Sequence, residues 1–183
     1  MNFCSNCGEA TIRRVPVGDN RPRDLCERCG MIHYQNPKII AGCVVLEQNK
    51  VLLCKRAIEP RYGLWTLPAG FMENGETVAQ AALRETWEEA RATPDIDQLY
   101  VVTSIPRINQ VYMLYLAFLN RGQYNSGPES LETKLFSMAE IPWDELAFHT
   151  VRDTLIQLKQ DLEIGSFSLH CIDQDETQKS ARV

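Results

Sequence analysis

No apolar run in this sequence of 183 residues approaches the roughly 20 residues that a membrane-spanning helix needs. The first residues, Met1-Asn2-Phe3-Cys4, lack the basic segment followed by an apolar one that is typical of a secretory signal. Basic residues are in the minority, and a net charge of −5 with a pI of about 5.3 argues against broad binding to nucleic-acid phosphates. We therefore expect a soluble, cytoplasmic protein.

Histidine is scarce, and cysteine is the residue with a pattern. The three histidines, His33, His149 and His170, are scattered, and we interpret them as structural or surface residues. Four of the seven cysteines form two Cys-x2-Cys pairs, which are Cys4 with Cys7 and Cys26 with Cys29. The 18 residues between the pairs fall in the range of zinc sites. Two disulfides are the alternative, and the absence of a secretory signal disfavours it.

Residues 1–34 are therefore predicted to be a zinc ribbon with a closed, structural Cys4 site. So few residues bury little apolar surface, so that metal binding must supply folding energy. Cys43 and Cys54 lie in apolar runs and are predicted to be core residues, whereas Cys171 has no assigned role.

The most informative motif is a set of residues at fixed spacing: Gly70, Glu76, Arg84, Glu85, Glu88 and Glu89. Residues three and four apart share one face of a helix, so that the last three carboxylates should cluster. Such carboxylates repel one another unless a cation lies between them, and a hard divalent ion such as Mg²⁺ suits oxygen ligands. The alternative is a solvated acidic helix in which Arg84 pairs with Glu88. The Gly and Glu upstream weigh against it.

The helix that carries these carboxylates should begin after Thr77, because Thr77 and Gln80 form a capping-box pattern. Residues 78–91 are mostly good helix formers. The spacing of Ala79, Leu83, Trp87 and Ala90 predicts a buried stripe, with the carboxylates off it.

Strands are predicted on both sides of this helix. Residues 39–46 and 51–56 should form a hairpin, and 63–68, 99–105, 110–119 and 134–136 are further strands. A second helix is expected from about 145 to 162, and the polar segment from 172 should be a mobile tail. This order predicts an α/β fold with a sheet covered on both faces.

The spaced motif resembles the signature of the Nudix hydrolases, Gly-x5-Glu-x7-Arg-Glu-(apolar)-x-Glu-Glu-x-Gly-(apolar). All six positions named above match, whereas Thr86 replaces an aliphatic residue and Arg91 replaces the closing Gly. The resemblance implies a Nudix α/β/α sandwich with a mixed sheet over residues 35–165, between the ribbon and a C-terminal tail at 166–183.

The resemblance also implies a metal-dependent pyrophosphohydrolase that uses Mg²⁺ or Mn²⁺. Glu85, Glu88, Glu89 and the Ala69 carbonyl are the implied metal ligands, and Arg84 and Glu76 orient them. A general base or further ligand often comes from a later loop, for which Glu129 and Glu132 are the candidates. The alternative is that these two glutamates are solvated loop residues.

The substrate should be a small nucleotide. Candidate binding residues near the site are Arg56, Arg61, Tyr62, Trp65, Phe71, Arg107 and Tyr112, through stacking or phosphate pairing. The ribbon in front resembles zinc-ribbon Nudix enzymes that cleave NADH or FAD to two monophosphates. The segment 104–110 departs from the Ser-Gln-Pro-Trp-Pro-Phe-Pro motif of the NADH branch, which favours FAD or ADP-ribose-like substrates.

Two other functions stay open. One is a ribbon-based regulator that binds nucleic acid or protein on a Nudix scaffold, since five arginines lie in the ribbon. The other is a hydrolase of nucleoside triphosphates or RNA caps. The Nudix resemblance is also compatible with a homodimer, and nothing predicts a membrane partner.

Overall fold

The computed structural model describes residues 1–174, and its contacts divide the chain into two compact units, Met1–Pro37 and Lys38–Val183. The last part of the predicted tail, from residue 175, lies outside the described residues. None of the helices in the described part is both long and apolar enough to span a bilayer.

The first unit is a small three-stranded antiparallel sheet made of β1 (Ile12–Arg14), β2 (Arg23–Leu25) and β3 (Ile32–His33). Each Cys-x2-Cys pair is followed by a glycine with positive φ, Gly8 at 74° and Gly30 at 75°. Their N–H groups donate to the carbonyls of Cys4 and Cys26, each at 2.9 Å. Two equivalent turns thus present the two pairs of thiols, as expected for a zinc ribbon.

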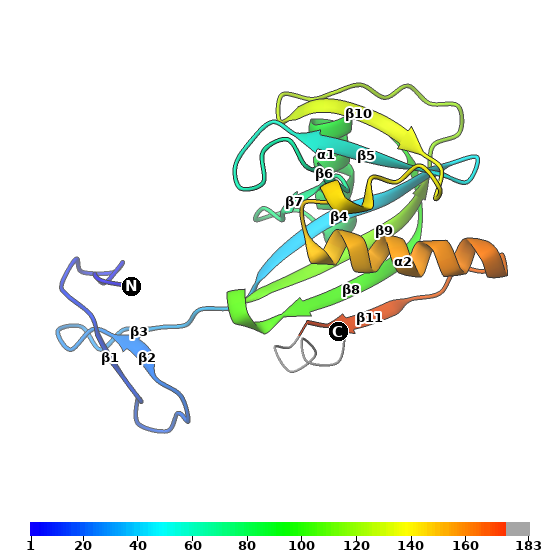
Figure 1. Ribbon diagram of the computed structural model, residues 1–183. Helices are drawn as coiled ribbons and strands as arrows, with labels where there is room; N and C mark the ends of the chain where they lie inside the picture. The colour runs from blue at the N-terminus through cyan, green and yellow to red at the C-terminus, as the bar shows by residue number, and fades with distance from the viewer. Residues whose placement is uncertain (175–183) are drawn as a thin grey trace. The chain divides into compact units, whose positions relative to one another are not determined.

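The second unit is built on a mixed sheet in the order β10-β5-β4-β9-β8-β11 (Figure 1). Its long strands are β4 (Lys38–Glu47), β5 (Lys50–Arg56), β8 (Asp95–Ile105), β9 (Gln110–Phe118) and β10 (Ser130–Phe136). The strand β11 (His170–Asp173) is shorter. Two short strands, β6 (Trp65–Thr66) and β7 (Ala69–Phe71), pair with β5 and β4. The β4–β9 and β8–β11 pairs are parallel and the others antiparallel.

Two helices cover opposite faces of this sheet, α1 (Val78–Ala90) behind it and α2 (His149–Ile164) in front of it (Figure 1). One apolar cluster includes Val151, Leu155 and Leu158 of α2, and the other includes Ala81 and Ala90 of α1. The 3₁₀ turns η1 (Pro106–Ile108) and η2 (Trp143–Glu145) lie between elements. The predicted α/β/α sandwich is therefore confirmed.

Helix α1 begins where the sequence predicts, because Thr77 and Gln80 cap each other reciprocally. Its predicted buried stripe is only partly confirmed: Ala90 is buried, whereas Leu83 is 37% exposed and Trp87 is 49% exposed. The buried face consists of Ala81, Ala82, Thr86, Glu89 and Ala90. Small side chains let the helix approach the sheet closely, so that the largest apolar residues are left outside and a carboxylate is carried inside.

The predicted tail also needs correction, since its first part forms β11 beside β8. Asp161 near the end of α2 accepts hydrogen bonds from the Tyr100 hydroxyl at 2.9 Å and from His170 at 2.8 Å. This shared acceptor fixes β11 to the helix and the sheet. Helix α2 itself ends at Gly165, whose φ is 77°.

Candidate active site and thiol site

The four patterned cysteines converge in the first unit. All seven cysteines are free, and the four Sγ atoms of the patterned set lie within 4.8 Å of one another. The Sγ atoms of Cys4 and Cys29 are 3.6 Å apart, and those of Cys7 and Cys26 are 3.5 Å apart. Four Zn–S bonds of about 2.3 Å in a tetrahedron place sulfurs about 3.8 Å apart. The thiols therefore fit a structural zinc ion, and His33 is not part of the set.

The second candidate site is centred on Glu89, which is only 7% exposed. Its carboxylate accepts a long hydrogen bond of 3.4 Å from the Ala69 N–H in β7. Burial raises the pKa of Glu89 to about 8, and the nearby charges of Glu85 and Glu129 act in the same direction, while Arg56 opposes them. Burial also raises the pKa of Glu85. Carboxyl groups are thus concentrated where water is partly excluded, and burial disfavours their charged forms.

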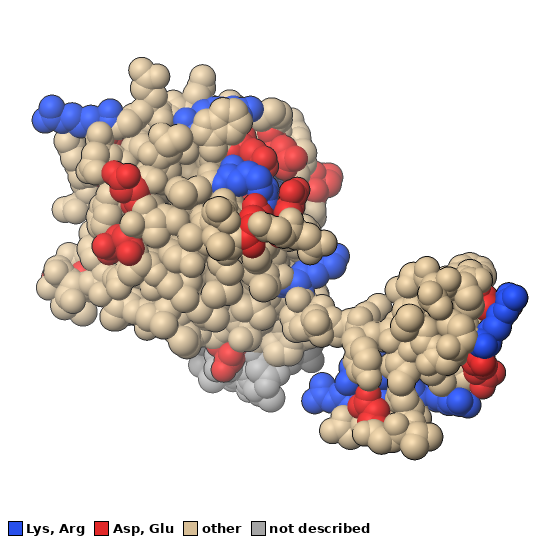
Figure 2. Space-filling view, turned by 180° about the vertical axis from the view of Figure 1, so that it is seen from behind, with Lys and Arg blue, Asp and Glu red and all other residues tan. Residues whose placement is uncertain are grey.

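Arg84 organises the outer side of this cluster. Its guanidinium binds both carboxylate oxygens of Glu76, at 3.0 and 2.8 Å, and donates to Glu85 at 2.7 Å and to Glu88 at 3.3 Å. It also donates to the Phe71 carbonyl at 3.1 Å. The Arg84 hydrogen bond lowers the pKa of Glu76 to about 2. Figure 2, which shows the molecule from behind, displays basic side chains bordered by acidic ones on the second unit.

Two glycines allow other segments to reach the helix. A Cβ on Gly70 would overlap the carboxylate of Glu85, and a Cβ on Gly127 would overlap the backbone carbonyl of Glu88. The Gly127 N–H donates to the Glu89 carbonyl at 2.9 Å, which ties the loop before β10 to the end of α1. At Gly127 the obstacle is rigid backbone, so that glycine is needed there, whereas at Gly70 it is the flexible end of a side chain.

The loop bears on the choice between the two candidate bases. The charge of Glu129 is among the causes that raise the pKa of both Glu85 and Glu89. Glu132 pairs with Lys55 across the β10–β5 ladder, beyond a bulge, and both glutamates are exposed. The sequence could not separate the two.

The two candidate metal sites differ in how far their ligand atoms are already arranged around a common point. Among the described residues, the thiols are the one set of three or more potential ligands that lie within 4.8 Å of one another. Glu85 and Glu88 are instead bridged by the Arg84 guanidinium. The carboxylates still suit a hard divalent cation, because Glu89 is buried beside other acids and every donor is oxygen. The Arg84 hydrogen bonds occupy one oxygen of each carboxylate, Oε1 of Glu85 and Oε2 of Glu88.

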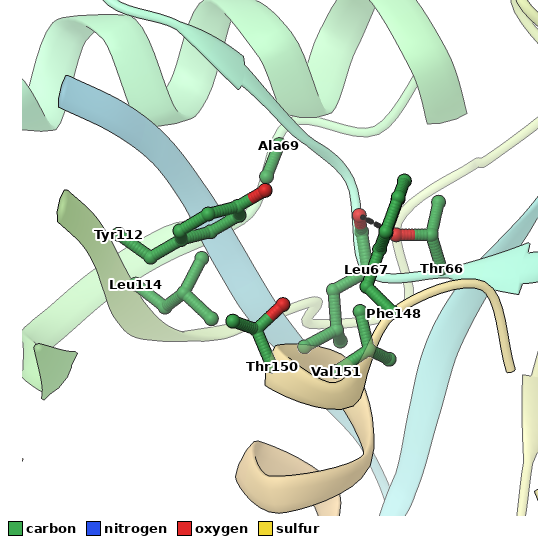
Figure 3. A pocket seen from close by; sticks show the side chains of 8 residues that line it. All are labelled: Thr66, Leu67, Ala69, Tyr112, Leu114, Phe148, Thr150 and Val151. Atoms are coloured by element: carbon green, nitrogen blue, oxygen red, sulfur yellow. Dashed lines mark hydrogen bonds between the residues drawn. The ribbon is translucent and has the colours of Figure 1, made fainter. Parts of the chain in front are cut away.

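A small recess opens beside Ala69 on the α2 side of the sheet (Figure 3). It has a volume of about 20 Å³ and is lined by Thr66, Leu67, Ala69, Tyr112, Leu114, Phe148, Thr150 and Val151. The Arg56 guanidinium lies 5.2 Å from the centre of the Phe148 ring. Because Arg56 also affects the pKa of Glu89 and of Tyr112, it connects the recess with the carboxylates.

The candidate substrate residues separate into several groups. Tyr112 and Arg56 lie at the recess, whereas Tyr62, Phe71, Arg61 and Arg107 are exposed on the surface. Trp65 does not suit substrate stacking, because it is 5% exposed and packs edge-on against Phe136 with ring centres 4.9 Å apart.

Sequence reasoning missed Phe148 and Thr150 at the recess. The sequence signal that could have indicated them is that α2 begins after Phe148, without a Ser, Thr, Asp or Asn at its N-cap.

Family models match both units of the chain. The model described as "NUDIX domain" matches residues 36–158, and the model described as "Nudix N-terminal", a zinc ribbon, matches residues 2–35. A crystal structure of a NUDIX hydrolase from Nitrosomonas europaea is 52% identical, with a TM-score of 0.89, and covers 95% of this chain and 100% of its own.

Curated relatives are more distant. An ADP-ribose pyrophosphatase of Methanocaldococcus jannaschii is 32% identical over 119 residues, which are 63% of this chain and 69% of the relative. The NAD-capped RNA hydrolase NudC of Edwardsiella ictaluri is 32% identical over 134 residues, 71% of this chain and 49% of the relative. The chain thus spans about half the length of NudC. The NUDIX domain of Shewanella oneidensis NrtR, solved with ADP ribose, is 26% identical with a TM-score of 0.59, over 73% of this chain and 91% of its own.

Proposed function

This chain belongs to the Nudix hydrolase family, and we propose that it is a metal-dependent pyrophosphohydrolase of ADP-ribose-type substrates, which it cleaves to two monophosphates. The names of the archaeal pyrophosphatase and of NudC support a diphosphate that carries ADP on one side. FAD contains the same ADP diphosphate and remains a candidate from the sequence.

The burial of Glu89 carries this proposal. A carboxylate that is 7% exposed, with a pKa raised to about 8 and two further acids beside it, is costly for a metal-free scaffold. A bound divalent cation would remove that cost and would also neutralise a diphosphate. Perturbed carboxylates in such a setting are typical of functional sites.

Each residue of the cluster has a distinct part in the proposed mechanism. Glu85, Glu88, Glu89 and the Ala69 carbonyl would hold Mg²⁺ or Mn²⁺, which when bound neutralises phosphate oxygens and lowers the pKa of water. Arg84 positions Glu85 and Glu88, and Glu76 in turn fixes Arg84 through two hydrogen bonds. Arg84 and Glu76 are therefore positioning residues.

Glu129 is the proposed general base, because it is the loop carboxylate near Glu85 and Glu89. It would accept a proton from the attacking water. The water oxygen then bonds to one phosphorus, the bridging P–O bond breaks, and the second phosphate leaves as a monoester.

The test is product analysis with Mg²⁺ or Mn²⁺ and a panel of ADP-ribose, NADH, NAD⁺, FAD, NAD-capped RNA, diadenosine polyphosphates and nucleoside triphosphates. We expect ADP-ribose to yield AMP and ribose 5-phosphate, and Glu89→Gln to lower kcat by at least about 10³-fold. Glu129→Gln should slow the reaction far more than the matched Glu132→Gln. Preferred turnover of a triphosphate would overturn the substrate class.

The charges of the ribbon bear on the regulator alternative. Three of its arginines are paired within the unit: Arg14 with Glu27 at 3.1 Å, Arg23 with Asp19 at 3.0 Å and Arg28 with Glu9 at 3.3 Å. Such pairing leaves little positive charge for nucleic-acid phosphates. Absence of turnover from a folded, zinc-loaded protein would nevertheless favour a binding role.

A further inference from the structure

Helix α2 begins at the recess without a side-chain cap. Its N-cap residue is Phe148, whose side chain makes no capping hydrogen bond, in contrast to Thr77 at the start of α1. The first N–H groups of a helix have no partners within the helix, and they carry partial positive charge. The start of α2 therefore offers hydrogen-bond donors beside the recess.

A buried hydroxyl lies at the same place. Thr150 is 4% exposed, and its Oγ1 atom has no hydrogen-bond partner among the residues the structure describes. Figure 3 shows this oxygen pointing into the space between Tyr112 and Phe148. Buried polar groups in native proteins nearly always have a partner, so that an unpaired hydroxyl aimed into a recess indicates a ligand group.

The size of the recess limits what that group can be. A volume of about 20 Å³ accommodates one water-sized polar group and excludes a base or flavin ring. Most of the lining is apolar, and the side-chain hydroxyls in it belong to Thr66, Tyr112 and Thr150. Thr66 already donates to the Leu67 carbonyl at 3.1 Å. Burial raises the pKa of Tyr112, which keeps its hydroxyl neutral.

The recess lies next to the proposed reaction centre. Ala69 lines it while donating its N–H to Glu89, and Arg56 contacts Phe148 while its charge reaches Glu89. A diphosphate held at the carboxylates would thus place an attached sugar near Thr150.

We propose that Thr150 recognises one hydroxyl of a ribose attached to the diphosphate, with the Tyr112 hydroxyl and the first N–H groups of α2 as further partners. Thr150 would thus be a specificity residue of the proposed pyrophosphohydrolase, and the inference rests on that proposed function. The remainder of the sugar would lie at the mouth of the recess, against Phe148.

The test uses Thr150→Val, which keeps the shape of the side chain and removes its hydroxyl. The matched control is Thr154→Val, because Thr154 is also buried with an unpartnered hydroxyl in the described structure but lies one turn further along α2, outside the recess. We expect Thr150→Val to raise KM for ADP-ribose about tenfold, with kcat changed less than about twofold. Thr154→Val should leave KM unchanged.

Analogues of ADP-ribose that each lack one ribose hydroxyl identify the partner. One of them should show the same tenfold rise in KM with the unmodified protein and no further rise with Thr150→Val, as expected for a directly coupled pair. Unchanged KM in Thr150→Val, or an equal rise in Thr154→Val, would overturn the proposal.

Failure of the proposed function can be distinguished from failure of this inference. If ADP-ribose is not hydrolysed, its affinity is measured by calorimetry in the presence of Mg²⁺. If ADP-ribose binds more weakly to Thr150→Val than to Thr154→Val, the ribose-hydroxyl site is supported although the proposed hydrolysis is not. Equal affinities, or no binding at all, would overturn it.

Discussion

In the ribbon, four thiols already lie within 4.8 Å of one another, whereas in the hydrolase unit a guanidinium bridges the carboxylates Glu85 and Glu88. The thiol set is closed and leaves no coordination position for a substrate. The carboxylate set is open, and the Arg84 guanidinium bridges two of its members. The preformed thiol site thus suits a structural role, and the open carboxylate site suits the proposed chemistry.

The cores of the two units differ in the same way. The buried apolar residues of the ribbon are Cys4, Pro16, Leu25 and Cys26, two of which belong to the thiol set, and Phe3, Val17 and Tyr34 are exposed. The hydrolase unit instead packs an apolar cluster on each face of its sheet. A metal ion should therefore be essential to the fold of the first unit and dispensable to that of the second.

Cys26→Ser provides the strongest test of this contrast. We expect the variant to lose zinc and the ribbon to become sensitive to proteases, since few apolar contacts remain to hold it, while the hydrolase unit stays folded. Metal content by mass spectrometry and mapping of limited-proteolysis sites measure both effects. The control is Cys171→Ser, because Cys171 is exposed and lies outside the thiol set. A metal-free ribbon that resists proteolysis would break the comparison.

Gly70→Ala should separate chemistry from stability in the hydrolase unit. The new Cβ meets the flexible end of Glu85, which can move aside, so that we expect kcat/KM to fall about 10- to 100-fold with less than about 1 kcal/mol lost in unfolding free energy.

The matched variant Gly127→Ala meets the backbone of Glu88 instead and should cost about 1–3 kcal/mol. Kinetics and chemical denaturation of both variants provide the check. The explanation is wrong if Gly70→Ala is as unstable as Gly127→Ala or retains full activity.

These sites show how far the sequence alone could lead. The capping box of Thr77 and the β4–β5 hairpin depend on neighbouring residues, and both were predicted correctly. The buried face of α1 was not, because Leu83 and Trp87 have the right periodicity for a stripe but are too large for the close approach to the sheet.

Features that depend on distant segments were also missed. The composition of residues 170–173 does not predict a strand. The strand β11 forms because these residues pair with β8 and because His170 hydrogen-bonds to Asp161. Thr150 lines the recess only because α2 meets β9 and β7 there. The preference for Glu129 over Glu132 as the proposed base likewise rests on the loop that Gly127 fixes to α1.

The buried charge of Glu89 predicts a pH dependence that the ribbon should not share. Its pKa is raised from the ordinary 4.5 to about 8, so that the folded state binds more protons than the unfolded state between these values. Stability in magnesium-free buffer should therefore fall as the pH rises from about 4.5 to 8, by at most about 1.4 kcal/mol per pH unit.

Glu89→Gln should remove this part of the slope, and Mg²⁺ should stabilise the unmodified protein more at pH 8 than at pH 5. Chemical denaturation at several pH values, with and without Mg²⁺, gives the difference between the two proteins. Parallel curves for both would mean that Glu89 is ionised without a cation.

The smallest effect is expected at Arg91, where the family signature has glycine. Arg91 adopts a left-handed conformation with φ of 49°, and its guanidinium lies 3.9 Å from the centre of the exposed Trp87 ring. Left-handed backbone costs a non-glycine residue about 1–2 kcal/mol, and a cation–π contact stabilises it by about 0.5–1 kcal/mol.

Arg91→Gly removes both the backbone strain and the ring contact, whereas Arg91→Ala removes only the contact. We therefore expect Arg91→Gly to lie within about 1 kcal/mol of the unmodified protein and Arg91→Ala to be the less stable variant, as measured by chemical denaturation followed by tryptophan fluorescence. The reverse order would show that the left-handed backbone at this helix end carries no net strain for a residue with a side chain.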